Sequence, residues 1–190
     1  MNLSSSMALA DVGIPMIVIE WPLMLAALVP VIILEALLIR RWLPLSYRQT
    51  FKGTAAANVV STLAGVPLAW LMLLATEFAV GLPMVIAADK LHLNPDEPVL
   101  RVIFMLVSSA WIEGEGDSMK WIIPACIAIL LVPCFFLSVW IESKVCFGLW
   151  NNLDREAIRR GVYRSNLASY AALFILACCW IGYGYFSSRH

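Results

Sequence analysis

Two sets of acid, amide and hydroxyl side chains recur in this sequence at nearly the same spacing. In each set a glutamate is followed by a basic segment and then by an Asn-x-x-Ser pattern, and the members are Glu35, Asn58 and Ser61, and then Glu142, Asn166 and Ser169. The glutamate precedes the asparagine by 23 positions in the first set and by 24 in the second. Polar side chains inside an apolar region are costly unless they find partners. We therefore predict that each glutamate accepts hydrogen bonds from the asparagine, the serine or a nearby arginine across a helical hairpin.

Two chemical roles fit these residue types. The first is a polar clamp, in which interhelical hydrogen bonds of roughly 0.6–2 kcal/mol each fix the hairpin. The second is a duplicated ion or substrate site near the inner leaflet, with the carboxylates as ligands. Coincidence remains a third alternative, because a match over so few positions is a weak signal.

Glu77 is the other candidate intramembrane acid. It lies near the outer end of an apolar stretch that continues to Ala88, which is too long for one straight span. We expect a break near Gly81–Pro83, because proline removes a backbone donor and clashes with the preceding turn. If the helix instead continues, Glu77 lies within the membrane, and an intramembrane acid is a functional candidate by default.

Other chemistry has little support. The sequence has two histidines, His92 and His190, and it contains no HExxH, GxxxxGK[ST] or GxSxG pattern. The five cysteines form no CxxC pair and are interpreted as buried packing residues. The acidic segment 113–117 is interpreted as a flexible turn rather than a cation site. We therefore predict no enzymatic activity, no cofactor, no metal and no nucleic-acid partner.

Composition places these residues in a membrane protein. The chain is 62% hydrophobic and 14% charged, with a mean hydropathy of +0.84, whereas soluble domains are about 25% charged. A helix needs about 20 apolar residues to cross a bilayer. Four stretches meet this length and are the predicted spans, at about 16–39, 54–79, 121–141 and 166–186.

Charge predicts the orientation of these spans. Lys and Arg concentrate in the connections 40–53 and 142–165, while acids outnumber them in the long connection 80–120. The positive-inside rule makes the two basic loops cytoplasmic and both termini non-cytoplasmic. Within the outer loop, the apolar run 99–112 is short for a span and is interpreted as interfacial or re-entrant. A fifth span there would put the two basic loops on opposite sides.

The predicted fold is an all-α integral membrane protein of four transmembrane helices, arranged as two hairpins in a parallel repeat. Small residues at four-residue spacing favour close helix packing, as at Ala57, Ser61 and Gly65. We expect a non-catalytic accessory or scaffold subunit of the plasma (inner) membrane, which contacts lipid and packs against other membrane proteins or itself. The alternative is an oligomeric transporter or channel component that uses the intramembrane acids.

Overall fold

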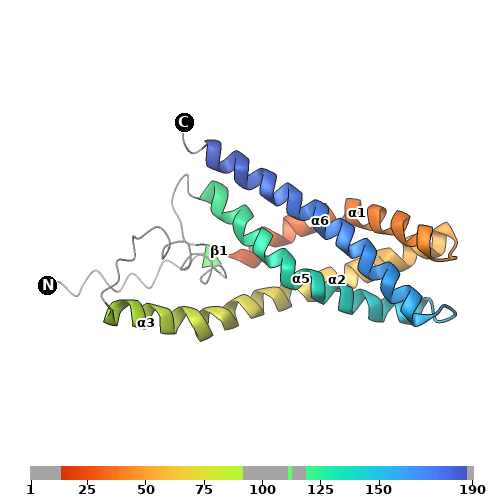
Figure 1. Cartoon of the computed structure of the whole chain (residues 1–190), viewed down its shortest axis with the longest axis horizontal. Coiled ribbons are helices and arrows are strands. Elements are labelled where there is room, and N and C mark those ends of the chain that lie inside the picture. Colours follow the sequence, from red (N-terminus) through yellow and green to blue (C-terminus); the bar gives the residue numbers. More distant parts are fainter. Residues whose placement is uncertain (1–13, 92–110, 113–118, 188–190) are drawn as a thin grey trace.

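The computed structural model describes residues 14–91, 111–112 and 119–187. Almost all of these residues are helical, as expected (Figure 1). His92, His190, the segment 113–117 and most of the run 99–112 lie outside the described residues. The last two residues of that run, Trp111–Ile112 (β2), pair antiparallel with Ile14–Pro15 (β1).

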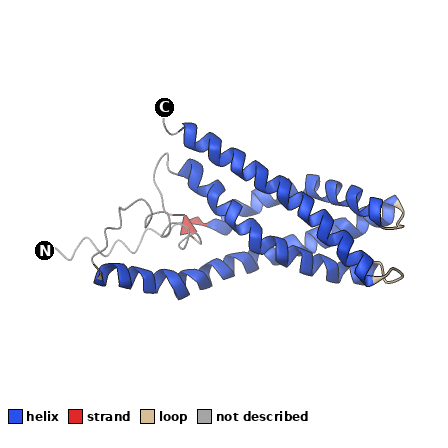
Figure 2. Ribbon diagram, in the orientation of Figure 1, coloured by secondary structure: helices blue, strands red, loops and turns tan. Residues whose placement is uncertain are grey.

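Four long helices form the body of the protein. They are α1 (Met16–Trp42), α2 (Tyr47–Thr76), α5 (Met119–Leu149) and α6 (Arg155–Ser187). Neighbouring pairs are α1 with α2, α2 with α5, α5 with α6, and α6 with α1, so the helices surround a common interior. Both short connections lie together at one end of the bundle (Figure 2), which we call the basic end.

The connections at the basic end are much shorter than predicted. Only 43–46 and 150–154 separate the helices, so most of the expected loops 40–53 and 142–165 is helical. The predicted spans are shorter than these helices because basic residues mark where a membrane ends, whereas a helix continues until its backbone is capped. Ser46 caps α2, accepting from the backbone N–H of Gln49 at 3.3 Å while the Gln49 side chain accepts from the Ser46 N–H at 3.1 Å. Asp154 caps α6 by accepting from the Ala157 N–H at 3.0 Å.

Among the described residues, three helical segments are long and apolar enough to cross a membrane, namely Tyr47–Ala87, Ile123–Leu149 and Arg155–Gly184. Large apolar side chains such as Val132, Phe136 and Ile175 point outward and are more than half exposed. Water would penalise such a surface, whereas lipid would not. The chain is therefore a membrane-embedded helical protein.

The expected break after Glu77 takes a milder form. Residues Glu77–Gly81 form one π-helical turn (η2), and the helix then continues as α3 (Leu82–Lys90). A π turn re-routes the backbone hydrogen bonds without ending the helix. Pro83 follows closely after this turn, and the π turn accommodates the backbone hydrogen bond that proline cannot donate. Glu77 thus stays within a continuous helical segment and is half-buried.

Apolar packing is densest at the basic end. A buried cluster there contains Ile39, Leu43, Ala57, Cys146, Trp150, Ile158 and Val162. The prediction that every cysteine is buried is wrong for Cys178 and Cys179, which are exposed on α6. In a membrane, an exposed apolar thiol faces lipid at little cost, so the apolar sequence around these two residues did not distinguish core from lipid.

Candidate functional site: a closed ring of buried polar side chains

The six polar residues identified from the sequence meet inside the four-helix body. Each of the six is at most 4% exposed, and the set comprises Glu35, Asn58, Ser61, Glu142, Asn166 and Ser169. One turn of each long helix contributes to this layer, which lies close to the apolar cluster of the basic end. Buried polar atoms need hydrogen-bond partners, so the contacts of each carboxylate decide what this layer does.

Glu35 on α1 accepts hydrogen bonds from both hairpins. Asn58 Nδ2 on α2 donates to Glu35 Oε2 at 2.7 Å, within the same hairpin. Ser169 Oγ on α6 donates to Glu35 Oε1 at 2.5 Å, from the other hairpin. Each oxygen of this carboxylate therefore has a donor of its own.

Glu142 on α5 repeats this arrangement. Asn166 Nδ2 on α6 donates to Glu142 Oε2 at 2.7 Å, and Ser61 Oγ on α2 donates to Glu142 Oε1 at 2.9 Å. As the sequence predicts, each asparagine donates to the glutamate of its own hairpin. Each serine, however, donates to the glutamate of the other hairpin. The sequence pattern could not reveal this exchange, because Ser61 and Glu142 are 81 positions apart.

Together these four hydrogen bonds form a closed ring. One bond crosses each of the four helix interfaces, from α1 to α2, from α2 to α5, from α5 to α6, and from α6 back to α1. We call the six residues the polar ring. No helix can move away from the other three without breaking two of these bonds.

Contacts to the backbone orient the donors of the ring. The amide nitrogen of Asn58 also donates to the Thr54 carbonyl, and that of Asn166 to the Val162 carbonyl, both at 3.1 Å. Both serine hydroxyls lie near the carbonyl of the asparagine three residues earlier, at 3.0–3.1 Å. A hydroxyl has only one hydrogen, so each serine has this carbonyl as a second acceptor when the glutamate bond is lost.

Two glycines lie where the hairpins contact each other, and sequence analysis did not identify them; only Gly53 needs the absence of a side chain, since a Cβ on Gly161 would make an ordinary contact. Gly53 and Gly161 each precede the ring asparagine of their helix by five positions. A Cβ built on Gly53 would lie 2.7 Å from Trp150 Cε2, and one on Gly161 would lie 3.6 Å from Leu43 Cδ1. Each glycine therefore contacts an apolar residue from the connection of the opposite hairpin. Trp150, which follows α5, packs against Gly53, and Leu43, which follows α1, packs against Gly161. The shared spacing to the Asn-x-x-Ser pattern is the signal that could have revealed them.

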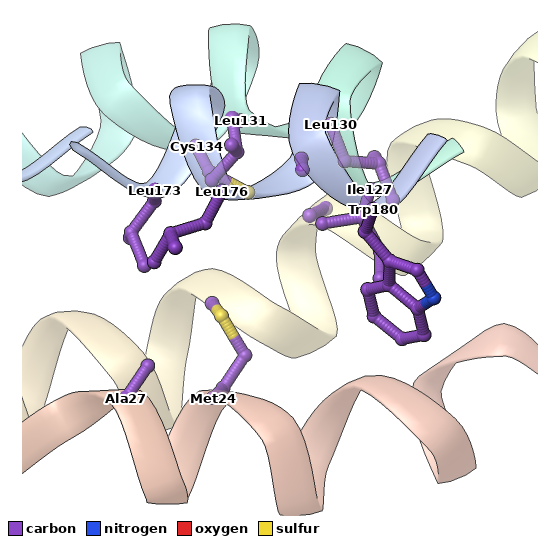
Figure 3. A pocket seen from close by; sticks show the side chains of 11 residues that line it. Met24, Ala27, Ile127, Leu130, Leu131, Cys134, Leu173, Leu176 and Trp180 are labelled. Atoms are coloured by element: carbon purple, nitrogen blue, oxygen red, sulfur yellow. The ribbon is translucent and has the colours of Figure 1, made fainter. Parts of the chain in front are cut away.

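Beyond the ring, away from the basic end, the interior opens into an apolar cavity of about 230 Å³. Figure 3 shows Met24 and Ala27 of α1 facing Leu173 and Leu176 of α6, with Leu130 of α5 also lining the space. This cavity has few polar atoms, so it suits apolar matter and not an ion.

A smaller cavity of about 50 Å³ adjoins the apolar one and reaches the ring. Both cavities share Met24 and Cys134 in their walls, and the smaller one is also lined by Ser61 and Glu142. Ser138 and Tyr170, whose hydroxyls lie 2.7 Å apart, provide a further polar part of its wall. One side of the ring is therefore accessible from the interior of the bundle.

The chemistry available to the ring is acceptance of protons or cations, or purely structural hydrogen bonding. In the part of the chain that the structure describes, no group of three His, Cys, Asp or Glu side chains could hold a metal ion. Glu77 does not join the ring, because it lies 19 residues beyond Asn58 along the same helical segment, about 28 Å at 1.5 Å per residue.

Comparison with known proteins gives no indication of the function of this chain. No protein-family model matches the chain, and neither the curated proteins nor the solved structures contain a match. The ring, the cavities and the charged end of the bundle are therefore the features that indicate a function.

Proposed function

We propose that this chain is a non-catalytic accessory or scaffold subunit, a rigid four-span bundle that packs against other membrane proteins. The observation that carries this proposal is the closure of the polar ring. All four carboxylate oxygens already have donors from the protein. A site that binds and releases an ion needs ligand atoms that are free to coordinate it, whereas a clamp needs them engaged.

The proposal includes a duplicated hairpin as the origin of the fold. The paired contacts of Glu35 and Glu142, and the paired glycine approaches, support a parallel repeat about an axis along the membrane normal. With four spans, the basic connections lie in the cytoplasm and both termini lie outside it. We also propose that the chain resides in the plasma (inner) membrane.

A surface for partners is available on α6. The stripe of small residues predicted on α2 is used inside the protein, since Ala57, Ser61 and Gly65 are all buried. Ala171 and Ala172 on α6 are exposed instead. Small residues allow the backbone of another helix to approach closely in lipid, so this face fits a helix of a partner protein or of a second copy.

The test is crosslinking and mass spectrometry on native membranes, with the wild type and the double variant Glu35→Gln/Glu142→Gln as bait. We expect a reproducible membrane-protein partner with both baits, because glutamine can preserve the ring. The side-chain oxygen of each glutamine can still accept a hydrogen bond from the asparagine. The serine hydroxyl can donate to its neighbouring backbone carbonyl instead, and the glutamine nitrogen can then donate to the serine oxygen. Recovery of the chain without any crosslinked neighbour would contradict the proposal.

The second candidate is an oligomeric transporter or channel component. The small cavity that reaches Glu142 favours it, as do two buried polar atoms, Thr54 Oγ1 and Asn166 Oδ1, for which no partner is present among the described residues. A transport role requires an ionisable carboxylate, so the same double variant separates the two candidates. Solute or ion flux into liposomes that is present in the wild type and lost in the folded glutamine variant would establish transport in place of scaffolding.

A further inference from the structure

A cleft at the basic end has the composition of a lipid headgroup site. It lies between α5 and the first turns of α6 and encloses about 590 Å³. Three cations line it, Lys144 on α5 and Arg155 and Arg159 on α6, and all three are exposed. Phosphate groups are bound in proteins by such convergent lysine and arginine side chains.

The two acids in the cleft do not neutralise these cations directly. Asp154 is engaged as the cap of α6, where it accepts from the Ala157 N–H at 3.0 Å. Glu156 forms an ion pair with Arg160 at 3.7 Å. Arg155 lies over the Phe147 ring, with its guanidinium carbon 5.8 Å from the ring centroid, which holds the base of the cleft in place.

The wall of the cleft continues from charged to apolar along one face of α5. Phe136, Val139 and Trp140 line it on the side away from the connection, within a segment apolar enough to cross a membrane. Phe136 is 65% exposed and Trp140 is 61% exposed. Since Trp favours the headgroup zone, a ligand here would have an anionic group at the cations and apolar chains along the aromatic residues.

Ser143 gives an independent indication of a ligand. It lines the cleft and is only 7% exposed, yet its hydroxyl has no hydrogen-bond partner among the residues that the structure describes. A buried hydroxyl without a partner costs roughly as much as a lost hydrogen bond, so such groups are rare in native structures. Rotation of Ser143 about its Cα–Cβ bond would bring this buried hydroxyl to a phosphate oxygen or ester carbonyl in the cleft, which would satisfy it.

The first hairpin shows that the fold does not need these charges. When the two glutamates and the two Asn-x-x-Ser patterns are aligned, Lys144, Arg155 and Arg159 correspond to Leu37, Tyr47 and Phe51, and Ser143 corresponds to Ala36. The cation–π pair of each hairpin has the opposite polarity. In the first hairpin the arginine is on the first helix, where Arg40 lies over Tyr47, whereas in the second hairpin it is on the second helix, where Arg155 lies over Phe147. At these aligned positions the second hairpin therefore carries cations and a hydroxyl that the first hairpin lacks.

We infer that this cleft binds an anionic phospholipid, with its phosphate held by Lys144, Arg155, Arg159 and Ser143 and an acyl chain along Trp140 and Phe136. Anionic lipids are concentrated in the cytoplasmic leaflet of membranes. The cleft opens at the basic end of the bundle, where both connections lie. The position of the site along the helices thus agrees with the leaflet in which its ligand is abundant.

The experiment is native mass spectrometry of the purified chain in nanodiscs made with equal parts of phosphatidylglycerol and phosphatidylcholine. We expect retention of one phosphatidylglycerol in preference to phosphatidylcholine. The variant Lys144→Leu/Arg159→Phe takes its new residues from the first hairpin and should reduce that preference about tenfold. The control Arg48→Gln/Lys52→Gln removes the same charge from the same end outside the cleft and should keep most of it.

Three results would overturn the inference. They are equal retention of the two lipids by the wild type, an equal loss in the control variant, and displacement of the lipid by inorganic phosphate, which would indicate a soluble anion as the ligand. If the double variant fails to fold, Ser143→Ala serves instead, because it removes a hydroxyl without a hydrogen-bond partner in the described part of the chain. It should weaken the preference several-fold without lowering the thermal stability, and an unchanged preference would also overturn the inference.

Discussion

Replacing Glu142 by alanine is expected to lower the free energy of unfolding by about 2–4 kcal/mol. The substitution removes both acceptors that Ser61 and Asn166 use between helices. Ser61 can turn to the Asn58 carbonyl, but one N–H of Asn166 is left without an acceptor in a buried site. The removed atoms also leave a cavity that the rigid helices cannot fill by collapse.

Denaturation of the chain in bicelles by SDS, followed by circular dichroism, measures this change. Two variants act as controls. Glu142→Gln preserves the ring and should cost less than half as much, while Glu156→Ala removes an exposed acid and should stay within about 0.5 kcal/mol of the wild type. Equal stability of Glu142→Ala and the wild type would show that the ring contributes nothing to the fold.

Gly53→Ala is expected to cost about 1–3 kcal/mol through overpacking against Trp150. The added methyl group would lie within 2.7–2.8 Å of the indole Cε2 and Nε1 atoms. Trp150 is 5% exposed and belongs to the buried apolar cluster, so its ring has little room to move away. The two hairpins must then separate at the basic end, which also lengthens the bonds of the polar ring.

A matched glycine isolates this effect. Gly148 is helical and exposed, and a Cβ there would meet no atom within 4 Å. Gly148→Ala should therefore be neutral or stabilising by up to about 1 kcal/mol, as helix propensity predicts. Thermal unfolding of both variants in the same detergent compares them, and a Gly53→Ala protein as stable as Gly148→Ala would disprove the close approach of the hairpins.

Sequence patterns were informative about the polar residues because intramembrane polarity is expensive. Glu35, Asn58 and their counterparts stood out from an apolar background, and their spacing indicated a common hairpin. The spacing could not say which serine meets which glutamate. That depends on how two hairpins dock, a contact between residues as far apart as Glu35 and Ser169, which are separated by 134 positions.

Other features escaped prediction for physical reasons of their own. The helices extend beyond the predicted spans at the basic end because positive charge indicates a membrane boundary, whereas Ser46 and Asp154 indicate where a helix starts. The break at Gly81–Pro83 was expected from proline chemistry, but the π turn Glu77–Gly81 accommodates the proline and the helix continues as α3. Gly53 was missed because a glycine in an apolar helix shows its purpose only when the facing side chain is known.

The central claim, that the polar ring joins the two hairpins into one rigid body, is tested most directly by a double-mutant cycle between Glu35 and Ser169. These residues belong to different hairpins and lie 2.5 Å apart through Ser169 Oγ and Glu35 Oε1. We predict a coupling free energy of about 0.6–1.7 kcal/mol between Glu35→Ala and Ser169→Ala, whereas Glu35→Ala and Glu156→Ala should be additive. Additivity of the Glu35 and Ser169 substitutions within about 0.3 kcal/mol would contradict the claim.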